Sequence, residues 1–266
     1  MSAADQDLSP PALLATDSAC VGTLVPSPNF GARRAGVDML VLHYTGMASA
    51  DAAIELLRTP ASEVSCHYVV REDGSVVQMV AEAARAWHAG VSCWEGIADT
   101  NSRSIGIEVV NGGHDFGLPP FPPEQVAAVI ALSRDIVTRH AIRADRVLAH
   151  SDVAPGRKRD PGEHFPWAAL HAAGVGHLVP EARAEGGRFF MLGDSGEPVA
   201  ALKAMLALYG YGIALDDAYD AATADVVAAF QRHFRPSRVD GVTDASTILT
   251  LRELIATRPG DAPAVA

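Results

Sequence analysis

The chain has 266 residues, of which 48% are hydrophobic and 20% charged, a composition typical of a globular protein of one or two domains. Its 21 Lys and Arg residues against 32 Asp and Glu residues give a net charge of −11. Because affinity for nucleic acid rests largely on cationic contacts to phosphates, we expect no nucleic-acid partner. No window approaches the roughly 18 consecutive apolar residues of a membrane span, so none is predicted.

Residues 1–30 are rich in Pro, Ser and Ala without a sustained period, and they predict an N-terminal arm on the surface. They show neither the basic segment nor the apolar run of a signal peptide. The three cysteines, a small and odd number, favour a reducing compartment. Together these features predict a cytoplasmic protein, with a periplasmic location as the alternative if a signal segment has been removed.

Strands and helices alternate in the next part of the chain. The apolar run 37–42, followed by His43 and Tyr44, predicts a buried strand, and Ser49 can cap a helix that stops before Pro60. Further predicted elements are a hairpin over 68–80, a strand over 104–110, a helix over 122–140 and a strand over 146–150. This order predicts an α/β domain over residues 31–185, with loops at one edge of its sheet available for a site.

The strand 104–110 has one residue that breaks its apolar pattern. Ile105, Ile107 and Val109 alternate and share one face, so Glu108 projects from the other. Without further context, a solvated carboxylate on a strand is the default interpretation of Glu108.

The composition changes after residue 180, where 185–188 read as a linker. Three apolar stripes at helical spacing follow, the second and third preceded by the N-cap candidates Asp220 and Asp244. We expect a small three-helix domain over residues 190–258, one that leans on its neighbour for stability.

Two of the ten histidines have a positional reason to carry chemistry. His43 and His150 each end a predicted strand, and Asp160 follows ten residues after His150 in a Gly- and Pro-rich loop. Two histidines and an aspartate with an open fourth position form the ligand set of a catalytic Zn²⁺ site. The alternative from spacing alone is that both histidines are structural residues at strand ends.

Five segments occur in an order that resembles a known family: VLHYTG, CHYVVREDGSVVQMV, RAWHAG, NSRSIGIEVVNGG and VLAHSDVAPGRKRDPG. They are similar to the successive signatures of the zinc-dependent N-acetylmuramoyl-L-alanine amidases of the amidase-2 family, which share their fold with peptidoglycan recognition proteins. The C-terminal stretch resembles a three-helix peptidoglycan-binding module. The pair of resemblances covers roughly residues 30–257 and looks like the AmiD-type branch of these amidases.

The resemblance implies a central mixed β-sheet flanked by helices and a role for several residues. It assigns Zn²⁺ to His43, His150 and Asp160, the catalytic acid/base to Glu108, and stabilisation of the transition state to Lys158. A zinc-activated water is the nucleophile that amide hydrolysis needs at neutral pH. A carboxylate beside it can move the proton, and a cation can neutralise the oxyanion.

The same resemblance places Trp87 and His88 beside the substrate cleft, and Tyr44 is a candidate wall residue or an ordinary packed tyrosine. The expected activity is hydrolysis of the amide between N-acetylmuramic acid, or its 1,6-anhydro form, and the L-alanine of the stem peptide. The expected partners are therefore muropeptides, anhydro-muropeptides or peptidoglycan, in recycling or turnover of the cell wall. The alternative is a non-catalytic protein that binds peptidoglycan or muropeptides.

Overall fold

The computed structural model describes residues 15–183, 186 and 189–259. Its centre is a six-stranded sheet in the order β1 (Thr23–Leu24), β5 (Val76–Gln78), β4 (Tyr68–Val70), β7 (Ser104–Val109), β3 (Met39–Tyr44) and β8 (Val147–Ala149). β4 and β5 are antiparallel, and the other neighbouring pairs are parallel. A separate two-stranded sheet pairs β2 (Phe30–Ala32) with β6 (Ala84–Ala86). The predicted α/β fold with a mixed central sheet is confirmed.

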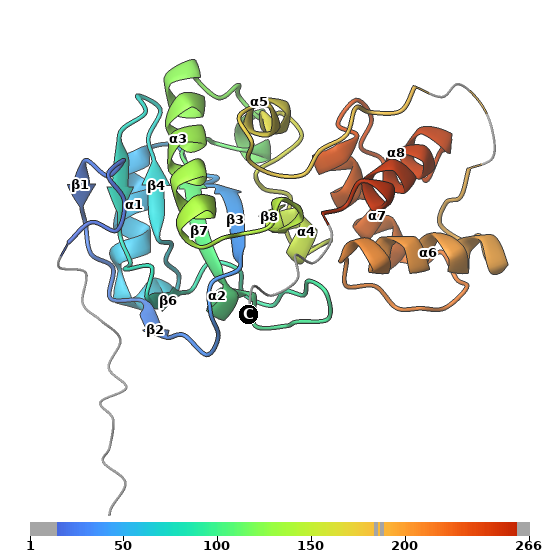
Figure 1. The fold of residues 1–266 in the computed structure, drawn as a ribbon, viewed down its shortest axis with the longest axis horizontal. Helices are drawn as coiled ribbons and strands as arrows, with labels where there is room; N and C mark the ends of the chain where they lie inside the picture. The colour runs from blue at the N-terminus through green and yellow to red at the C-terminus, as the bar shows by residue number, and fades with distance from the viewer. Residues whose placement is uncertain (1–14, 184–185, 187–188, 260–266) are drawn as a thin grey trace, which may run out of the picture.

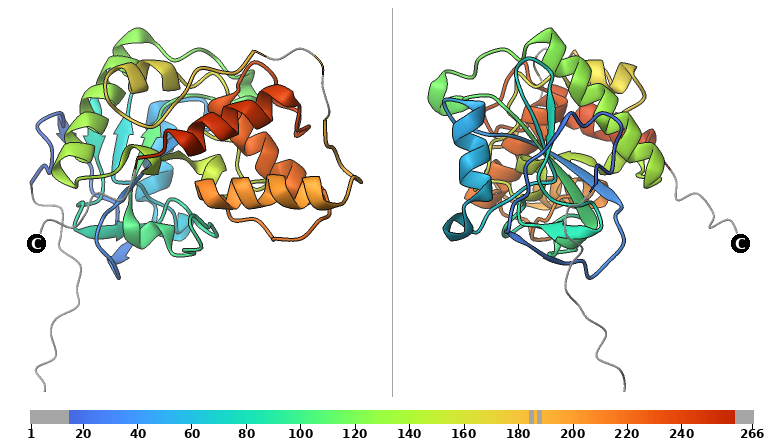
Figure 2. Two further views of the ribbon diagram at one scale, coloured as in Figure 1. Left: turned by 45° about the vertical axis from the view of Figure 1, so that its right-hand side comes forward. Right: turned by 90° about the vertical axis from the view of Figure 1, so that its left-hand side faces the viewer.

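Helices cover the two faces of the sheet (Figures 1 and 2). α1 (Ala50–Arg58) lies on one face, and the Ser49 side chain caps it by accepting from the Ala52 N–H. α3 (Pro123–Arg139) lies on the other, with α5 (Trp167–Ala172) beside it. Shorter helices lie between these elements: η1 (Pro60–Ser62), α2 (Thr100–Arg103), η2 (His114–Phe116), η3 (Ala144–Arg146) and α4 (His150–Val153).

The two faces of β7 have different neighbours. Ile105, Ile107 and Val109 are fully buried in a cluster with residues of α3, including Leu132. The opposite face, toward α1, carries Ser104, Gly106 and Glu108 on alternate positions. The predicted orientation of Glu108, away from the apolar set, is confirmed.

Two local expectations are corrected by the structure. Part of the predicted surface arm is ordered into the fold: Thr23–Leu24 forms β1 beside β5, and Phe30 begins β2, while residues 1–14 lie outside the described residues. His150 does not end a strand but begins α4, directly after β8. Its backbone turns there because the Asp152 carboxylate accepts from the Ala149 N–H and so starts the helix.

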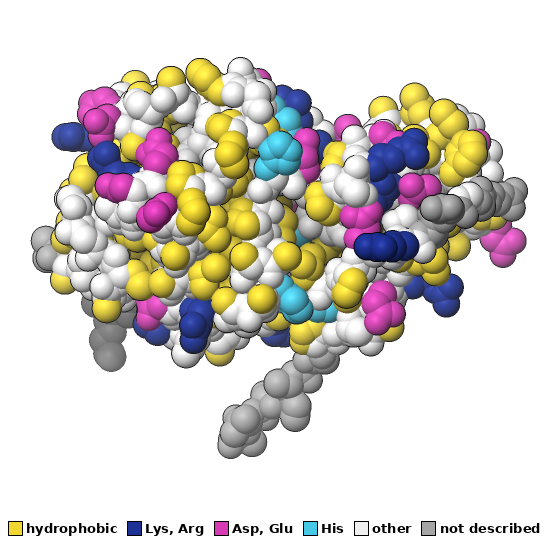
Figure 3. Space-filling view, turned by 90° about the horizontal axis from the view of Figure 1, so that it is seen from above, with side chains coloured by type: hydrophobic (Ala, Val, Ile, Leu, Met, Phe, Trp, Pro, Cys, Tyr) yellow, Lys and Arg dark blue, Asp and Glu magenta, His cyan; other side chains and the backbone are white. Residues whose placement is uncertain are grey.

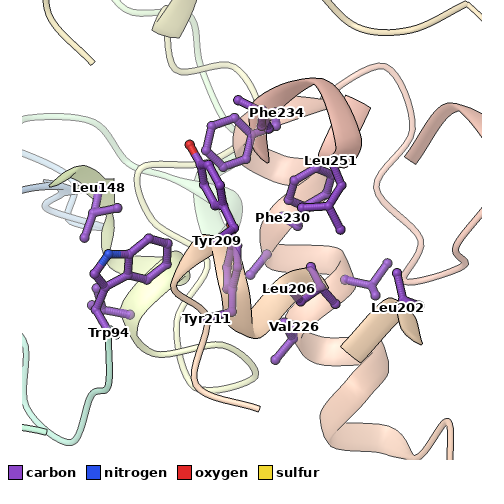
Figure 4. Close-up of a cluster of buried hydrophobic side chains, with 14 of the residues drawn as sticks. Trp94, Leu148, Leu202, Leu206, Tyr209, Tyr211, Val226, Phe230, Phe234 and Leu251 are labelled. Atoms are coloured by element: carbon purple, nitrogen blue, oxygen red, sulfur yellow. The ribbon is translucent and has the colours of Figure 1, made fainter. Parts of the chain in front are cut away.

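The C-terminal part forms three helices, α6 (Glu197–Tyr209), α7 (Ala221–Phe234) and α8 (Ala245–Ala256). Asp220 and Asp244 cap α7 and α8 by accepting from the N–H groups of Thr223 and Thr247, as predicted. These helices share one hydrophobic core with the α/β part: Trp94 and Leu148 pack in the same cluster as Tyr209, Tyr211 and Phe230 (Figure 4).

The described surface carries mixed charges. On the face seen in Figure 3, acidic and basic side chains are interspersed among apolar ones over both parts of the molecule. Among the helices that the structure describes, none is long and apolar enough to cross a lipid bilayer.

Candidate metal centre and active site

Three potential metal ligands converge at the C-terminal edge of the central strands. β3 and β8 are parallel neighbours, so their ends bring His43 and His150 together, and the loop after α4 adds Asp160. The two Nδ1 atoms are 2.9 Å apart, and Asp160 Oδ2 lies 3.0 Å from that of His43 and 2.9 Å from that of His150. All three residues are buried.

The chemistry of this donor set fits a cation. Burial and the neighbouring His150 lower the pKa of His43 to about 4, so its imidazole is neutral at neutral pH. Asp160 Oδ2 is buried against both inner nitrogens, and a cation held between the three groups would compensate its charge. The outer nitrogen of each imidazole meets another partner, at 3.0 Å from His88 Nδ1 for His43 and 3.1 Å from the Ala89 carbonyl for His150. The Nδ1 atoms of His43 and His150 therefore both face the carboxylate oxygen of Asp160, and these three atoms can together bind a divalent metal ion.

Glu108 lies beside His43 on the sheet. The register of the parallel pair β3 and β7 sets Glu108 opposite His43, so both side chains project from the same face. Glu108 Oε2 is buried and has no hydrogen-bond partner among the residues that the structure describes. Burial and the charge of Asp160 raise the pKa of Glu108 well above its ordinary value. A buried carboxyl group with a raised pKa beside potential metal ligands is typical of a general acid–base residue.

A cleft of about 470 Å³ opens onto these residues. Its walls include the predicted site residues Tyr44, Trp87, His88, Glu108, Lys158 and Asp160. Apolar side chains of α1, among them Leu56 and Leu57, line another side. Lys158 is half-buried, and within the described part of the chain no hydrogen bond or ion pair engages its ammonium group. That cation is free to meet a ligand in the cleft.

Tyr44 is anchored as a wall of the cleft. Its hydroxyl lies 2.9 Å from His114 Nδ1, and His114 Nε2 lies 3.0 Å from Glu163 Oε2. Glu163 is in turn 3.5 Å from Arg232 of α7. The Tyr44 ring packs against Gly113, where a Cβ atom would lie 2.4 Å from it and where φ is +65°. Only glycine fits at 113.

Three residues of the site went unnoticed in the sequence. Asn101 Oδ1 accepts from the backbone N–H groups of His88, at 3.1 Å, and Ala89, at 2.8 Å, and so holds the segment that contacts the histidine pair. Ser104 is the second of these residues and the first residue of β7, and its hydroxyl oxygen lies 3.1 Å from His88 Nε2. Asn101 and Ser104 lie in the segment NSRSIG, and His88 and Ala89 lie in RAWHAG. The contacts between the two segments are long-range, so no local sequence pattern indicates them.

Asp152 is the third, and it ties the site to the C-terminal helices. Its fully buried carboxylate accepts from the Tyr211 hydroxyl at 2.7 Å and lies 2.7 Å from His233 Nδ1 of α7. Asp152 stands two positions after His150 on α4. Through Asp152, Tyr211 and His233 of the C-terminal part stabilise the helix that carries a potential metal ligand.

Comparisons with known proteins agree with this geometry. Residues 33–163 match the family model described as N-acetylmuramoyl-L-alanine amidase, and residues 195–251 match a peptidoglycan binding domain. The N-acetylmuramoyl-L-alanine amidase AmiD of Escherichia coli strain K12 is 38% identical over 226 residues, 79% of each chain. The 1,6-anhydro-N-acetylmuramyl-L-alanine amidase AmpD of Enterobacter cloacae is 38% identical over 129 residues, which are 48% of this chain and 67% of that protein.

Solved structures extend the likeness to nearly the whole fold. AmiD from E. coli, in complex with the substrate anhydro-N-acetylmuramic acid-L-Ala-D-γ-Glu-L-Lys, superposes with a TM-score of 0.71 at 34% identity, over 85% of this chain and 91% of that one. AmpDh3 from Pseudomonas aeruginosa in complex with anhydromuramic pentapeptide gives a TM-score of 0.69 at 31% identity, over 84% and 93%. The chain therefore belongs to the N-acetylmuramoyl-L-alanine amidase family and joins an amidase domain to a domain of the peptidoglycan-binding type.

Proposed function

We propose that this protein hydrolyses the amide bond between N-acetylmuramic acid, in its ordinary or 1,6-anhydro form, and the L-alanine of the stem peptide. The observation that carries the proposal is the convergence of His43, His150 and Asp160 in a cleft where Glu108 stands on the same face of the sheet. The relatives AmiD and AmpD are named for this reaction, and AmiD was solved with an anhydro-muropeptide.

The metal that we propose for the site is Zn²⁺, held by His43 Nδ1, His150 Nδ1 and an oxygen of Asp160. Bound by three such ligands, zinc lowers the pKa of a water molecule to about 7 and polarises a carbonyl group. Neutral imidazoles and a carboxylate are donors that Zn²⁺ commonly takes, whereas hard cations such as Ca²⁺ and Mg²⁺ need several oxygen ligands, of which this set offers only the Asp160 carboxylate.

Glu108 acts as the general acid and base in this proposal. Its unpartnered oxygen and raised pKa suit a group that takes a proton from the attacking water and later delivers it to the leaving amine of L-alanine. Lys158 lines the same cleft with an unengaged ammonium group, and it stabilises the negative charge that develops on the carbonyl oxygen. Tyr44 and Trp87 form walls against which sugar and peptide pack.

The C-terminal helices act, we propose, as a structural flank of the amidase domain as well as a domain of the peptidoglycan-binding type. Support comes from the single hydrophobic core that includes Trp94 and Leu148 together with Tyr211 and Phe230. It also comes from the carboxylate of Asp152, which has partners in both parts. In this proposal the two domains span residues 31–185 and 190–258, and the interface between them belongs to one folding unit.

Soluble anhydro-muropeptides in the cytoplasm are the proposed substrates. All three cysteines, Cys20, Cys66 and Cys93, are unpaired thiols, which suits a reducing compartment. A cytoplasmic amidase of this kind acts in recycling, on fragments released from the wall. Fractionation of cells followed by detection of the untagged protein tests the compartment, and recovery from the periplasm would overturn it.

The test of the reaction is a parallel digest of anhydro-muropeptide, ordinary muropeptide and intact sacculi with the zinc-loaded protein. Mass spectrometry should find free peptide beginning with L-alanine and intact anhydro-sugar, with faster release from the soluble fragments than from sacculi. Binding without any release of peptide would identify a non-catalytic binding protein instead. Glu108→Gln protein serves as the control for contaminating amidases.

A further inference from the structure

The segment His88–Ala89 contacts both potential metal-binding imidazoles on the side away from the metal position. His88 Nδ1 lies 3.0 Å from His43 Nε2, and the two rings meet edge to face with centroids 5.1 Å apart. The Ala89 carbonyl oxygen lies 3.1 Å from His150 Nε2. One dipeptide thus meets the outer nitrogen of each histidine.

A chain of hydrogen bonds determines which nitrogen of His88 carries the proton. The Ser104 hydroxyl donates to the Thr100 carbonyl at 2.7 Å, so its oxygen is left to accept from His88 Nε2 at 3.1 Å. With the proton on Nε2, His88 Nδ1 is an acceptor. His43 Nε2 must then be the donor to it, which leaves the lone pair of His43 on Nδ1, toward Asp160 and His150.

The carbonyl of Ala89 imposes the same choice on His150. A carbonyl oxygen only accepts, so His150 Nε2 carries the proton and Nδ1 carries the lone pair. Arg157 Nη2 donates to the same oxygen at 2.5 Å and holds the carbonyl in place. Both imidazoles are therefore held in the tautomer that a metal needs, by partners only one residue apart.

The helix α2 and the strand β7 hold this dipeptide in place. Asn101 Oδ1 accepts from both of its N–H groups. The His88 ring lies directly over Gly106 of β7, where a Cβ atom would come within 2.5 Å of it. The φ angle of Gly106 is not in the left-handed region, so space for the imidazole, and not backbone conformation, requires glycine there.

We propose that His88 is a positioning residue that fixes the tautomer and direction of His43, and that the His88–Ala89 segment, held by Asn101, Ser104 and Gly106, prepares both histidines for the metal. The proposal rests on the proposed zinc site. In this proposal the RAWHAG segment orients the two potential metal-binding histidines from the side away from the metal position, and it also lines the cleft. Outer partners of this kind typically contribute 10- to 100-fold to metal affinity.

The test compares His88→Asn with His88→Leu, two side chains of nearly equal shape. The amide oxygen of asparagine stands close to the position of Nδ1 and can accept from His43, whereas leucine fills the space and excludes a substituting water. Zinc affinity is measured by competition with a chromophoric chelator. We expect a loss of 10- to 100-fold for His88→Leu and recovery of most of it in His88→Asn.

A second readout needs neither zinc nor activity. Long-range ¹H–¹⁵N spectra of the metal-free protein report which imidazole nitrogen of His43 is protonated. Wild type and His88→Asn should show the proton on Nε2, and His88→Leu should show a mixture of tautomers. Gly106→Ala, which removes no polar group but displaces the His88 ring, should weaken zinc binding as well.

The proposal is overturned if folded His88→Leu protein binds zinc as tightly as wild type and keeps the Nε2–H tautomer of His43. Thermal melts of the metal-free proteins identify variants that fail to fold, in which case Ser104→Ala replaces them. That substitution removes the acceptor for His88 Nε2 together with the hydroxyl that donates to the Thr100 carbonyl. Failure of the proposed function is a separate result, because it would appear as wild-type protein that binds zinc in the expected tautomer but releases no peptide.

Discussion

His43 and Glu108 are paired across the two central parallel strands, so a potential metal ligand and an unpartnered carboxylate project side by side from one face of the sheet. Neither residue could move to the other face without a one-residue slip of its strand, and such a slip would remove Ile107 or Leu42 from the apolar cluster that it shares with α3. The apolar cores on the two faces therefore determine the geometry of the site.

The metal ligands can be tested by zinc content. His150→Ala removes one of three donors, and we expect the purified protein to lose most of its zinc and its hydrolytic activity. Removal of zinc from wild type with a chelator should abolish hydrolysis, and added zinc should restore it. His171→Ala, at an exposed position on α5, should keep the full metal content. Full zinc occupancy in His150→Ala would exclude the assignment.

Glu108→Gln should retain zinc and lose turnover. The amide has nearly the same shape but cannot accept the proton, so we expect kcat to fall by about 10²- to 10⁴-fold. Initial rates on anhydro-muropeptide and zinc content measured on the same preparation provide the check. Turnover near that of wild type would mean that another group carries the proton.

Lys158→Met should lower kcat with little change in KM. The substitution keeps the length of the side chain and removes its charge, which acts on the oxyanion and not on the ground state. Loss of one such donor typically costs about 10²- to 10³-fold in kcat. Lys158→Arg keeps the charge and should recover part of the rate. A rise in KM at constant kcat would instead make Lys158 a substrate-binding residue.

Removal of residues 190–266 should leave a protein that aggregates or loses both activities, on soluble muropeptides and on sacculi. The deletion exposes Trp94 and Leu148 and leaves the buried carboxylate of Asp152 without Tyr211 and His233. Size-exclusion chromatography and parallel digests measure the outcome. A truncated protein that stays folded, cuts muropeptides normally and fails only on sacculi would show that the module is a wall anchor.

Glu82→Gln should destabilise the fold in a pH-dependent manner. Burial alone would raise the pKa of Glu82, but hydrogen bonds from Arg139, His140 and Tyr68 outweigh it and lower the pKa from 4.5 to about 2. Because the folded pKa is the lower one, the ionised carboxylate stabilises the native state above about pH 4.5, and this contribution is lost as the pH falls toward 2. The shift corresponds to a free energy on the order of 3 kcal/mol.

Urea unfolding of the metal-free proteins measures this effect. The difference in unfolding free energy between wild type and Glu82→Gln should be large at pH 7 and much smaller at pH 3. Glu55→Gln is the control, because Glu55 is exposed and its pair with Arg58 contributes about 0–1 kcal/mol. Equal destabilisation at both pH values would mean that packing and not charge holds Glu82.

Local patterns in the sequence determined the face on which strand residues lie, the starts of helices and the identity of the candidate site residues. The alternation in 104–109 placed Glu108 on the face opposite Ile105 and Ile107, and the aspartates before α7 and α8 marked their first turns. Such features depend on neighbours within a few residues, where periodicity and capping act. The family signatures likewise lie in continuous segments, so the sequence alone predicts His43, His150 and Asp160 as metal ligands, and the structure brings these three residues together.

Only the tertiary structure decided how these segments meet. The contact of His88 with His43, its support from Asn101 and the space for its ring over Gly106 join residues 13 to 45 positions apart in the chain, and no local pattern encodes them. The same holds for the strand at Thr23, which is ordered by pairing with β5 despite an irregular sequence, and for the core that Trp94 shares with the C-terminal helices. The physical reason is that burial and hydrogen-bond partners arise from long-range packing, whereas propensity and period act over a few residues only.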